Sequence, residues 1–146
     1  MKITTMNFTA MKAQHLISFS IVIFLGSLMI SFNSPEQEPW EVPNKYVKME
    51  NPTDADDKEN LSIGKQLYMK HCKSCHGKTG LGDGPKAAEL DTPSGDFSAD
   101  DFQAQSDGEL FYKTTFGRDD MPAYDKKIPS EEDRWLVVNY MRTFTN

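Results

Sequence analysis

The chain has 146 residues, of which 38% are hydrophobic and 26% are charged, and its formal net charge at pH 7 is −6. This length suits one folded domain with an additional segment attached to it. The acidic composition excludes nucleic acid as an expected partner, because binding to phosphates requires a basic surface. The excess of carboxylates instead favours a soluble domain.

An apolar segment lies near the N-terminus. Residues 16–32 read LISFSIVIFLGSLMISF, and the residues before them include Lys2 and Lys12 but no carboxylate. A basic stretch followed by an apolar run is typical of an export signal. The run also approaches the roughly 17–25 residues of a membrane-spanning helix, and no small-residue cleavage site follows it. We therefore predict that residues 1–33 are a signal peptide or an N-terminal membrane anchor.

A proline-rich and acidic stretch follows, and residues 34–58 are predicted to be a linker. Prolines favour an extended, semi-rigid spacer over a helix. They stand at four positions: Pro35, Pro39, Pro43 and Pro52. Trp40, Val42 and Tyr46 are unusual in a solvated tether. Two interpretations remain open for these three residues: they pack on the surface of the domain, or they dock against a partner subunit.

The folded domain is predicted to span residues 59–146 and to begin with a helix near Asn60. Ile63 and Leu67 lie at helical spacing, and Asn60 or Ser62 is the expected N-cap. This helix leads directly into the most specific motif of the chain.

The motif Cys72-Lys73-Ser74-Cys75-His76 contains both cysteines of the chain. The spacing C-x-x-C-H is that of covalent haem attachment. Cys72 and Cys75 would form thioethers with the haem vinyl groups, and His76 would be the proximal ligand of the iron. Two alternatives stay open, a structural zinc site and a redox dithiol. The first needs four ligands, and the second needs a βαβ pattern that the sequence does not show.

A glycine-rich segment follows the motif and is predicted to be a loop. Its glycines are Gly77, Gly80, Gly82 and Gly84. A phosphate-binding loop is excluded, because no strand precedes the segment and no Lys-Ser or Lys-Thr opens a helix after it. Pro85 ends the loop, and its carbonyl is the expected acceptor for the second ring N–H of His76, which a proximal imidazole normally donates. An ordinary turn proline is the alternative.

Two further helices are predicted towards the C-terminus. Ser106 and Glu109 form a capping box, and Gly117 is expected to end the helix that begins there. Ser130 and Asp133 form a weaker box before a strongly apolar final helix. No segment reads as part of a sheet. The sequence therefore predicts an all-α domain, with three or more helices around a large prosthetic group.

A second axial ligand is sought among the methionines. His15 lies in the N-terminal segment, and His71 is too close to the attachment motif to reach the opposite face of a haem. Met121 stands in a polar loop between two predicted helices, and Pro122 stiffens the backbone after it. Packing in a core explains most methionines but explains this one poorly. We predict that Met121 binds the iron opposite His76.

These features resemble class I cytochrome c. The resemblance covers residues 60–143 and rests on five features: Gly64 and Tyr68 before the motif, the motif itself with Gly77, the Gly82-Asp83-Gly84-Pro85 loop, residues 119–124, and residues 135–142. The attachment motif is short but highly specific, the methionine loop is moderately specific, and the helices alone would indicate little.

The resemblance implies a class I cytochrome c fold with one covalently bound haem c, whose iron is held by His76 and Met121. It also implies that the first and last helices cross where Gly64 meets Tyr140 or its neighbours. A helical glycine costs about 1 kcal/mol relative to alanine, and close packing would explain its presence. Trp135, on the last helix, is expected among the residues that contact the haem. The implied activity is one-electron transfer rather than catalysis.

The expected function is that of a monohaem c-type cytochrome that carries single electrons between respiratory redox partners, as a membrane-associated carrier or subunit. Haem attachment outside the cytoplasmic membrane places it on the periplasmic side of the bacterial inner membrane, anchored or exported. Five lysines near the motif suggest a basic docking rim, and scattered solvated lysines are the alternative. They are Lys65, Lys70, Lys73, Lys78 and Lys86.

Two other functions stay open. Residues 40–52 resemble segments that precede haem domains in cytochrome subunits of respiratory oxidoreductases, including alternative complex III. The chain is then a haem subunit fixed in a membrane quinol oxidoreductase. The other hypothesis is a haem sensor or enzyme with an open coordination site, which requires that Met121 does not bind the iron.

Overall fold

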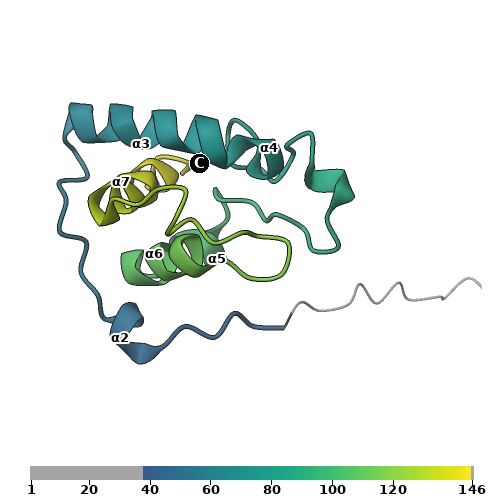
Figure 1. Ribbon diagram of the computed structural model, residues 1–146, viewed down its shortest axis with the longest axis horizontal. Helices are drawn as coiled ribbons and strands as arrows, with labels where there is room; N and C mark the ends of the chain where they lie inside the picture. The colour runs from purple at the N-terminus through teal and green to yellow at the C-terminus, as the bar shows by residue number, and fades with distance from the viewer. Residues whose placement is uncertain (1–37, 146) are drawn as a thin grey trace, which may run out of the picture. The chain divides into compact units, whose positions relative to one another are not determined.

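The computed structural model describes residues 38–145. The predicted apolar segment, residues 16–32, lies outside this range. The chain divides into two compact units, and the second, Pro39–Asn146, contains all the elements described below. They are helical (Figure 1): α2 (Asn44–Val47), α3 (Lys58–His71), α4 (Lys73–His76), the 3-10 helix η1 (Ala87–Glu89), α5 (Asp100–Gln103), α6 (Asp107–Phe116) and α7 (Glu131–Arg142).

The prediction of an all-α domain is confirmed. The described residues contain no strand, and one isolated bridge joins Arg118 and Met121. Among the same residues, no helix combines the length and the apolar character that crossing a bilayer requires.

The first long helix, α3, begins earlier than its apolar spacing predicted. Its N-cap is Asp57, whose carboxylate accepts hydrogen bonds from the backbone N–H groups of Glu59 and Asn60, at 2.9 Å each. The prediction of Asn60 or Ser62 as the cap was wrong. An aspartate satisfies the unpaired N–H groups of the first turn as well as serine or asparagine does, so a run rich in all three leaves the cap ambiguous.

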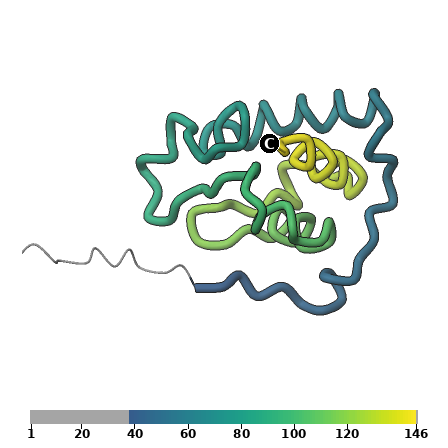
Figure 2. Tube along the Cα trace, turned by 180° about the vertical axis from the view of Figure 1, so that it is seen from behind, coloured from purple at the N-terminus to yellow at the C-terminus, as the bar shows by residue number. Residues whose placement is uncertain are grey.

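Helices α3 and α7 cross in close contact, as the views from both sides show (Figures 1 and 2). A Cβ added at Gly64 would overlap the carbonyl oxygen of Leu136 and would lie 3.2 Å from Cβ of Tyr140. The predicted crossing of the first and last helices at Gly64 is therefore confirmed. The glycine is needed here for its lack of a side chain, because any other residue would push the two backbones apart.

The core lies between α3, α6 and α7. Trp135, Val137 and Val138 of α7 are fully buried, and Tyr68 of α3 is buried to the same degree. Phe111 of α6 stacks on Trp135, with ring centroids 4.0 Å apart. The apolar character of the final helix on nearly every face follows from this central position.

The predicted boundaries of α6 and α7 are confirmed. Ser106 and Glu109 form a reciprocal capping box at the start of α6, and Gly117 ends that helix with φ of 63°. Ser130 accepts a hydrogen bond from the backbone N–H of Asp133 at 3.1 Å, and it is the N-cap of α7. Local capping chemistry therefore fixes the two helices between which the predicted methionine loop lies.

Residues 39–53, which belong to the stretch expected as a linker, pack against α6, and we call them the strap. A Cβ at Gly108 would overlap the carbonyl oxygen of Tyr46, so the strap crosses α6 closely at this glycine. The ring of Tyr46 lies 4.8 Å from Tyr112 and 5.6 Å from Phe116, centroid to centroid. Of the two interpretations of the strap aromatics, packing on the domain is the one observed.

The C-terminal end of the strap is joined to α6 and α7 by polar side chains. The Nδ2 group of Asn51 donates to Oδ1 of Asn139 at 2.6 Å and to Oδ2 of Asp107 at 3.1 Å. Asn139 is almost completely buried, and its own Nδ2 group donates to the hydroxyl of Thr53 at 2.9 Å. These bonds satisfy a buried amide that would otherwise destabilise the core.

We expect the Gly64→Ala variant to be less stable by about 1–3 kcal/mol, because the added methyl group overlaps the Leu136 carbonyl and the helices must separate. Urea denaturation followed by circular dichroism measures this. Ser62→Ala, at an exposed position of the same helix, is the control and should change the free energy of unfolding by less than about 0.5 kcal/mol. Equal stability of Gly64→Ala and the parent protein would contradict the close crossing.

Candidate haem site

The attachment motif lies where α3 ends and α4 begins. Cys72 is the C-cap of α3, and its backbone N–H donates to the carbonyl of Tyr68 at 2.8 Å. The N–H groups of Cys75 and His76 both donate to the carbonyl of Cys72, at 3.2 and 3.0 Å. Both thiols are free, and that of Cys72 is buried. The helical turn thus presents two thiols and an imidazole from one short, hydrogen-bonded segment.

Two tyrosines hold the ends of this segment. The hydroxyl of Tyr68 donates to the carbonyl of Gly77 at 2.9 Å in the buried core, and the hydroxyl of Tyr124 donates to the carbonyl of His71 at 2.8 Å. Each bond satisfies a carbonyl at a helix end. Their role was not identified from the sequence, because the bonds join residues that no local pattern relates.

The glycine-rich loop folds back on α4, and the prediction of a loop is confirmed. Backbone N–H groups of Gly82, Gly84 and Lys86 donate to the carbonyls of His76, Cys75 and Ser74, at distances of 3.0, 3.1 and 2.8 Å. A Cβ at Gly84 would overlap the Ser74 carbonyl oxygen. Glycine is required there because the loop backbone lies against the helix end.

The imidazole of His76 is mostly buried, and burial lowers its pKa, while a backbone contact with Ser94 acts in the opposite direction. A neutral imidazole is the form that binds a metal. The ring of Phe97 lies 4.5 Å from that of His76, inclined by 32°. Sequence reasoning did not identify Phe97, whose only local signal is an isolated aromatic residue in a polar loop.

The expected bond between Pro85 and His76 is not formed in this structure. The Nδ1 atom of His76 is buried and has no hydrogen-bond partner within residues 38–145, and Pro85 is exposed. The role assigned to Pro85 stays a prediction for the haem-loaded protein.

Met121 lies in a closed hairpin between α6 and α7. Its carbonyl accepts from the N–H of Arg118 at 2.9 Å, and its N–H donates to the Arg118 carbonyl at 2.8 Å. A Cβ at Gly117 would overlap the Met121 carbonyl oxygen, so this turn requires glycine. Asp120 accepts a hydrogen bond from the N–H of Asp91 at 2.9 Å and joins the hairpin to the loop before α5. Met121 is half-buried, and its role as an iron ligand stays a prediction.

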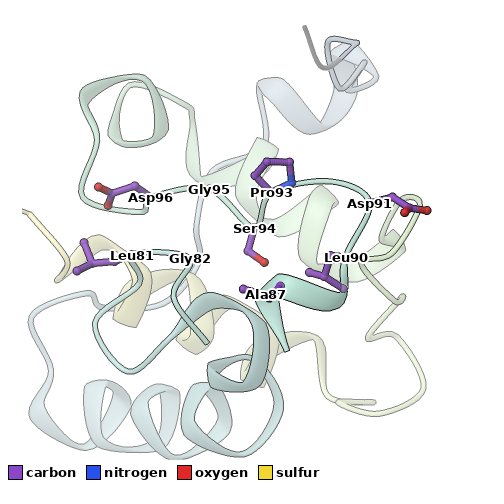
Figure 3. A pocket seen from close by; sticks show the side chains of 10 residues that line it. Leu81, Gly82, Ala87, Leu90, Asp91, Pro93, Ser94, Gly95 and Asp96 are labelled. Atoms are coloured by element: carbon purple, nitrogen blue, oxygen red, sulfur yellow. The ribbon is translucent and has the colours of Figure 1, made fainter. Parts of the chain in front are cut away.

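A cavity of about 420 Å³ adjoins the attachment motif. It lies between the glycine-rich loop with η1 and the loop that precedes Phe97 (Figure 3). Gly82, which donates to the His76 carbonyl, and Ser94, whose backbone contacts the imidazole, both line it. The cavity therefore lies beside the predicted proximal ligand.

Trp135 is placed in the centre of the core, stacked on Phe111. Its indole Nε1 is buried and has no hydrogen-bond partner in the described part of the chain. The contact between Trp135 and haem stays a prediction, which the unpaired N–H supports.

The residues present fit a large prosthetic group with its own acceptors. Three buried polar atoms lack a partner within residues 38–145, and such atoms are uncommon in folded proteins. They are His76 Nδ1, Ser94 Oγ and Trp135 Nε1. No group of three or more His, Cys, Asp or Glu in the same range could hold a metal ion, so the zinc alternative lacks further ligands there.

We expect Tyr124 to make the stability of the protein depend on alkaline pH. Burial raises its pKa from 10.0 to about 12. Because the folded-state pKa is the higher one, its contribution to stability is complete below pH 10 and is lost as pH rises towards 12. Tyr124→Phe should therefore flatten the fall of the unfolding free energy between these pH values, as measured by urea denaturation. An unchanged slope would contradict the burial of this hydroxyl.

Comparisons with known proteins assign most of the described chain to a family. Residues 59–141 match the family described as "Cytochrome C oxidase, cbb3-type, subunit III". A comparison with curated proteins found no match.

Similar chains are also found among solved structures, among them the following two. One is a chain of the "Kuenenia stuttgartiensis reducing HAO-like protein complex Kustc0457/Kustc0458", which is 27% identical with a TM-score of 0.59; the match covers 87% of this chain and 59% of that one. The other is the "KustC0563 c-type cytochrome", which is 27% identical with a TM-score of 0.49; the match covers 57% of this chain and 98% of that one. The chain thus belongs to the matched family, and it is a class I c-type cytochrome with covalently bound haem c and its iron.

Proposed function

We propose that this haem electron-transfer protein carries single electrons between respiratory redox partners on the periplasmic side of the bacterial inner membrane. Residues 1–33 would anchor it there or direct its export. The observation that supports the proposal most is the geometry of the motif. Cys72, Cys75 and His76 share one hydrogen-bonded turn. Hydrogen bonds from the hydroxyls of Tyr68 and Tyr124 fix the residues on either side of this turn. A rigid attachment suits a group whose iron changes charge while its ligands stay in place.

The haem would supply the one-electron chemistry, and the protein would hold it through two thioethers and two side chains on the iron. Cys72 and Cys75 would form the thioethers, and His76 and Met121 would bind the iron. Burial keeps the His76 imidazole neutral and able to bind. Ligation by methionine raises the reduction potential relative to a second histidine. The backbone bonds between Arg118 and Met121 support this assignment, because they restrict the position of the methionine.

A basic rim would receive the redox partner. All five lysines near the motif are exposed, although the chain as a whole is acidic. They are Lys65, Lys70, Lys73, Lys78 and Lys86. Redox partners form small, transient interfaces. A surface of one charge sign speeds their encounter when the partner carries the opposite sign. The rim would thus select acidic partners.

A second candidate is a haem subunit fixed within a membrane oxidoreductase, such as a quinol oxidoreductase of the alternative complex III type. One of the similar solved structures is that of a protein complex, which supports this candidate. This chain spans only 59% of that relative. Detergent extraction followed by purification distinguishes the two candidates: a carrier is recovered alone, and a subunit is recovered with its complex.

We expect Met121→Leu to remove the weak red absorption band of a methionine–iron(III) bond, to lower the midpoint potential, and to open the ferrous haem to carbon monoxide. Absorption spectroscopy and redox titration of the purified full chain measure these effects. Met69→Leu is the control, because it makes the same change at a half-buried methionine outside the hairpin. It should leave the absorption band, the midpoint potential and carbon monoxide binding unchanged. Ready carbon monoxide binding by the parent protein would contradict the proposal and favour an open-site sensor or enzyme.

The lysine rim predicts that electron transfer to an acidic partner slows as salt rises, because ions screen surface charges beyond about 10 Å at 0.1 M. Stopped-flow mixing of the reduced protein with an acidic acceptor over a range of ionic strength measures this. Rates that do not change with salt would exclude the rim as a docking surface.

A further inference from the structure

The strap follows α6 along its length, in the opposite direction. Its carbonyl at Tyr46 meets Gly108 in the first turn of α6, and the Tyr46 ring contacts Tyr112 and Phe116 further along. At the other end of the strap, Trp40 lies beyond the last turn of α6. Figure 1 shows this path, with α2 beneath α6 and the chain before α2 running beneath the hairpin.

The indole of Trp40 contacts two cations where α6 ends. The guanidinium carbon of Arg118 lies 4.7 Å from the ring centroid, and the ammonium of Lys113 lies 5.6 Å from it. Tryptophan is the best aromatic partner for a cation, and both distances are within the range of an attractive contact. Burial lowers the pKa of Lys113, so its ammonium is partly removed from water.

Arg118 is the first residue of the hairpin after Gly117, and its backbone exchanges two hydrogen bonds with Met121. Trp40 thus contacts the residue that pairs directly with the proposed iron ligand. Arg118 is also restrained by an ion pair with Asp119 at 3.2 Å, but the Asp119 side chain is 63% exposed and such a pair is weak. The contact with Trp40 ties Arg118 to a segment far away in the sequence.

We propose that Trp40 is a positioning residue for Met121. It holds the Arg118 side chain against the end of α6, and the backbone of Arg118 in turn positions Met121. The inference rests on the proposed ligation by Met121. A short hairpin makes few apolar contacts and is therefore prone to local opening. The strap counteracts this, because its own C-terminal end is fixed to the core by Asn51.

The test uses the haem-loaded full chain in detergent and compares Trp40→Ala with the parent protein. We expect imidazole to bind the ferric haem about two- to fivefold more tightly, because loss of a cation–π contact of ordinary strength makes opening of the hairpin that much more frequent. Hydrogen exchange at the Met121 N–H, measured by NMR, should speed up by a similar factor. Trp40→Phe keeps an aromatic face for Arg118. Its imidazole affinity and its exchange rate at Met121 should therefore stay close to those of the parent protein.

Lys45→Ala is the matched control. It removes a cation–π contact of the same kind, between Lys45 and Tyr46 at 4.8 Å, within the strap and away from the hairpin. It should change neither imidazole affinity nor exchange at Met121. The double variant Trp40→Ala, Arg118→Ala should show less than the sum of the two single effects, because the two side chains contact each other.

Three results would overturn the inference. Trp40→Ala could lower the global stability in urea and leave imidazole affinity and Met121 exchange unchanged, which would make Trp40 merely structural. Lys45→Ala could produce the same effects as Trp40→Ala. The two substitutions in the double variant could be additive. If the parent protein lacks the methionine–iron band, the proposed ligation fails, and exchange at Met121 still decides whether Trp40 holds the hairpin.

Discussion

The close crossing of α3 and α7 at Gly64 is the constraint on which the site depends. Helix α3 leads into Cys72 at its C-terminal end, and α7 begins directly after the segment that contains the methionine hairpin. With the helix backbones in contact at Leu136, the packing of the two helix surfaces sets the crossing angle, and the number of residues from the crossing to each end sets the distance between the ends. The crossing therefore sets the first long-range restraint on the position of the attachment motif relative to α7.

Tyrosine hydroxyls convert this spacing into a defined site. Tyr68 and Tyr124 reach the carbonyls of Gly77 and His71, which flank the attachment motif on both sides. Tyr124 also belongs to the chain that leaves the methionine hairpin, and its N–H donates to the carbonyl of Thr115 at 3.1 Å. The backbone and the side chain of this one residue therefore tie the hairpin segment, α6 and the attachment turn together, so a displacement of any of the three is opposed by the other two.

The parts of this structure that the sequence predicted are those with local causes. The capping box at Ser106 and the cap at Ser130 fixed two helices correctly, and the motif at Cys72 indicated the chemistry. Contacts between distant segments were not predictable in the same way. Phe97 lies against His76 only because a polar loop without periodicity returns to α4, and the strap looked like a linker because prolines removed any helical or strand pattern. Prolines exclude regular structure without excluding packing.

The packing of the strap on α6 has a thermodynamic implication. Ordering the backbone of one residue costs about 1–2 kcal/mol of conformational entropy. A tether that served only to span a distance would avoid this cost by remaining unordered in water. The strap is held instead by aromatic rings at Tyr46 and by the buried amide of Asn139. Trp40, near the N-terminal end of the strap, contacts Arg118, the residue that pairs with Met121. The ordering of the strap thus brings a contact from far away in the sequence to the hairpin that carries the proposed iron ligand.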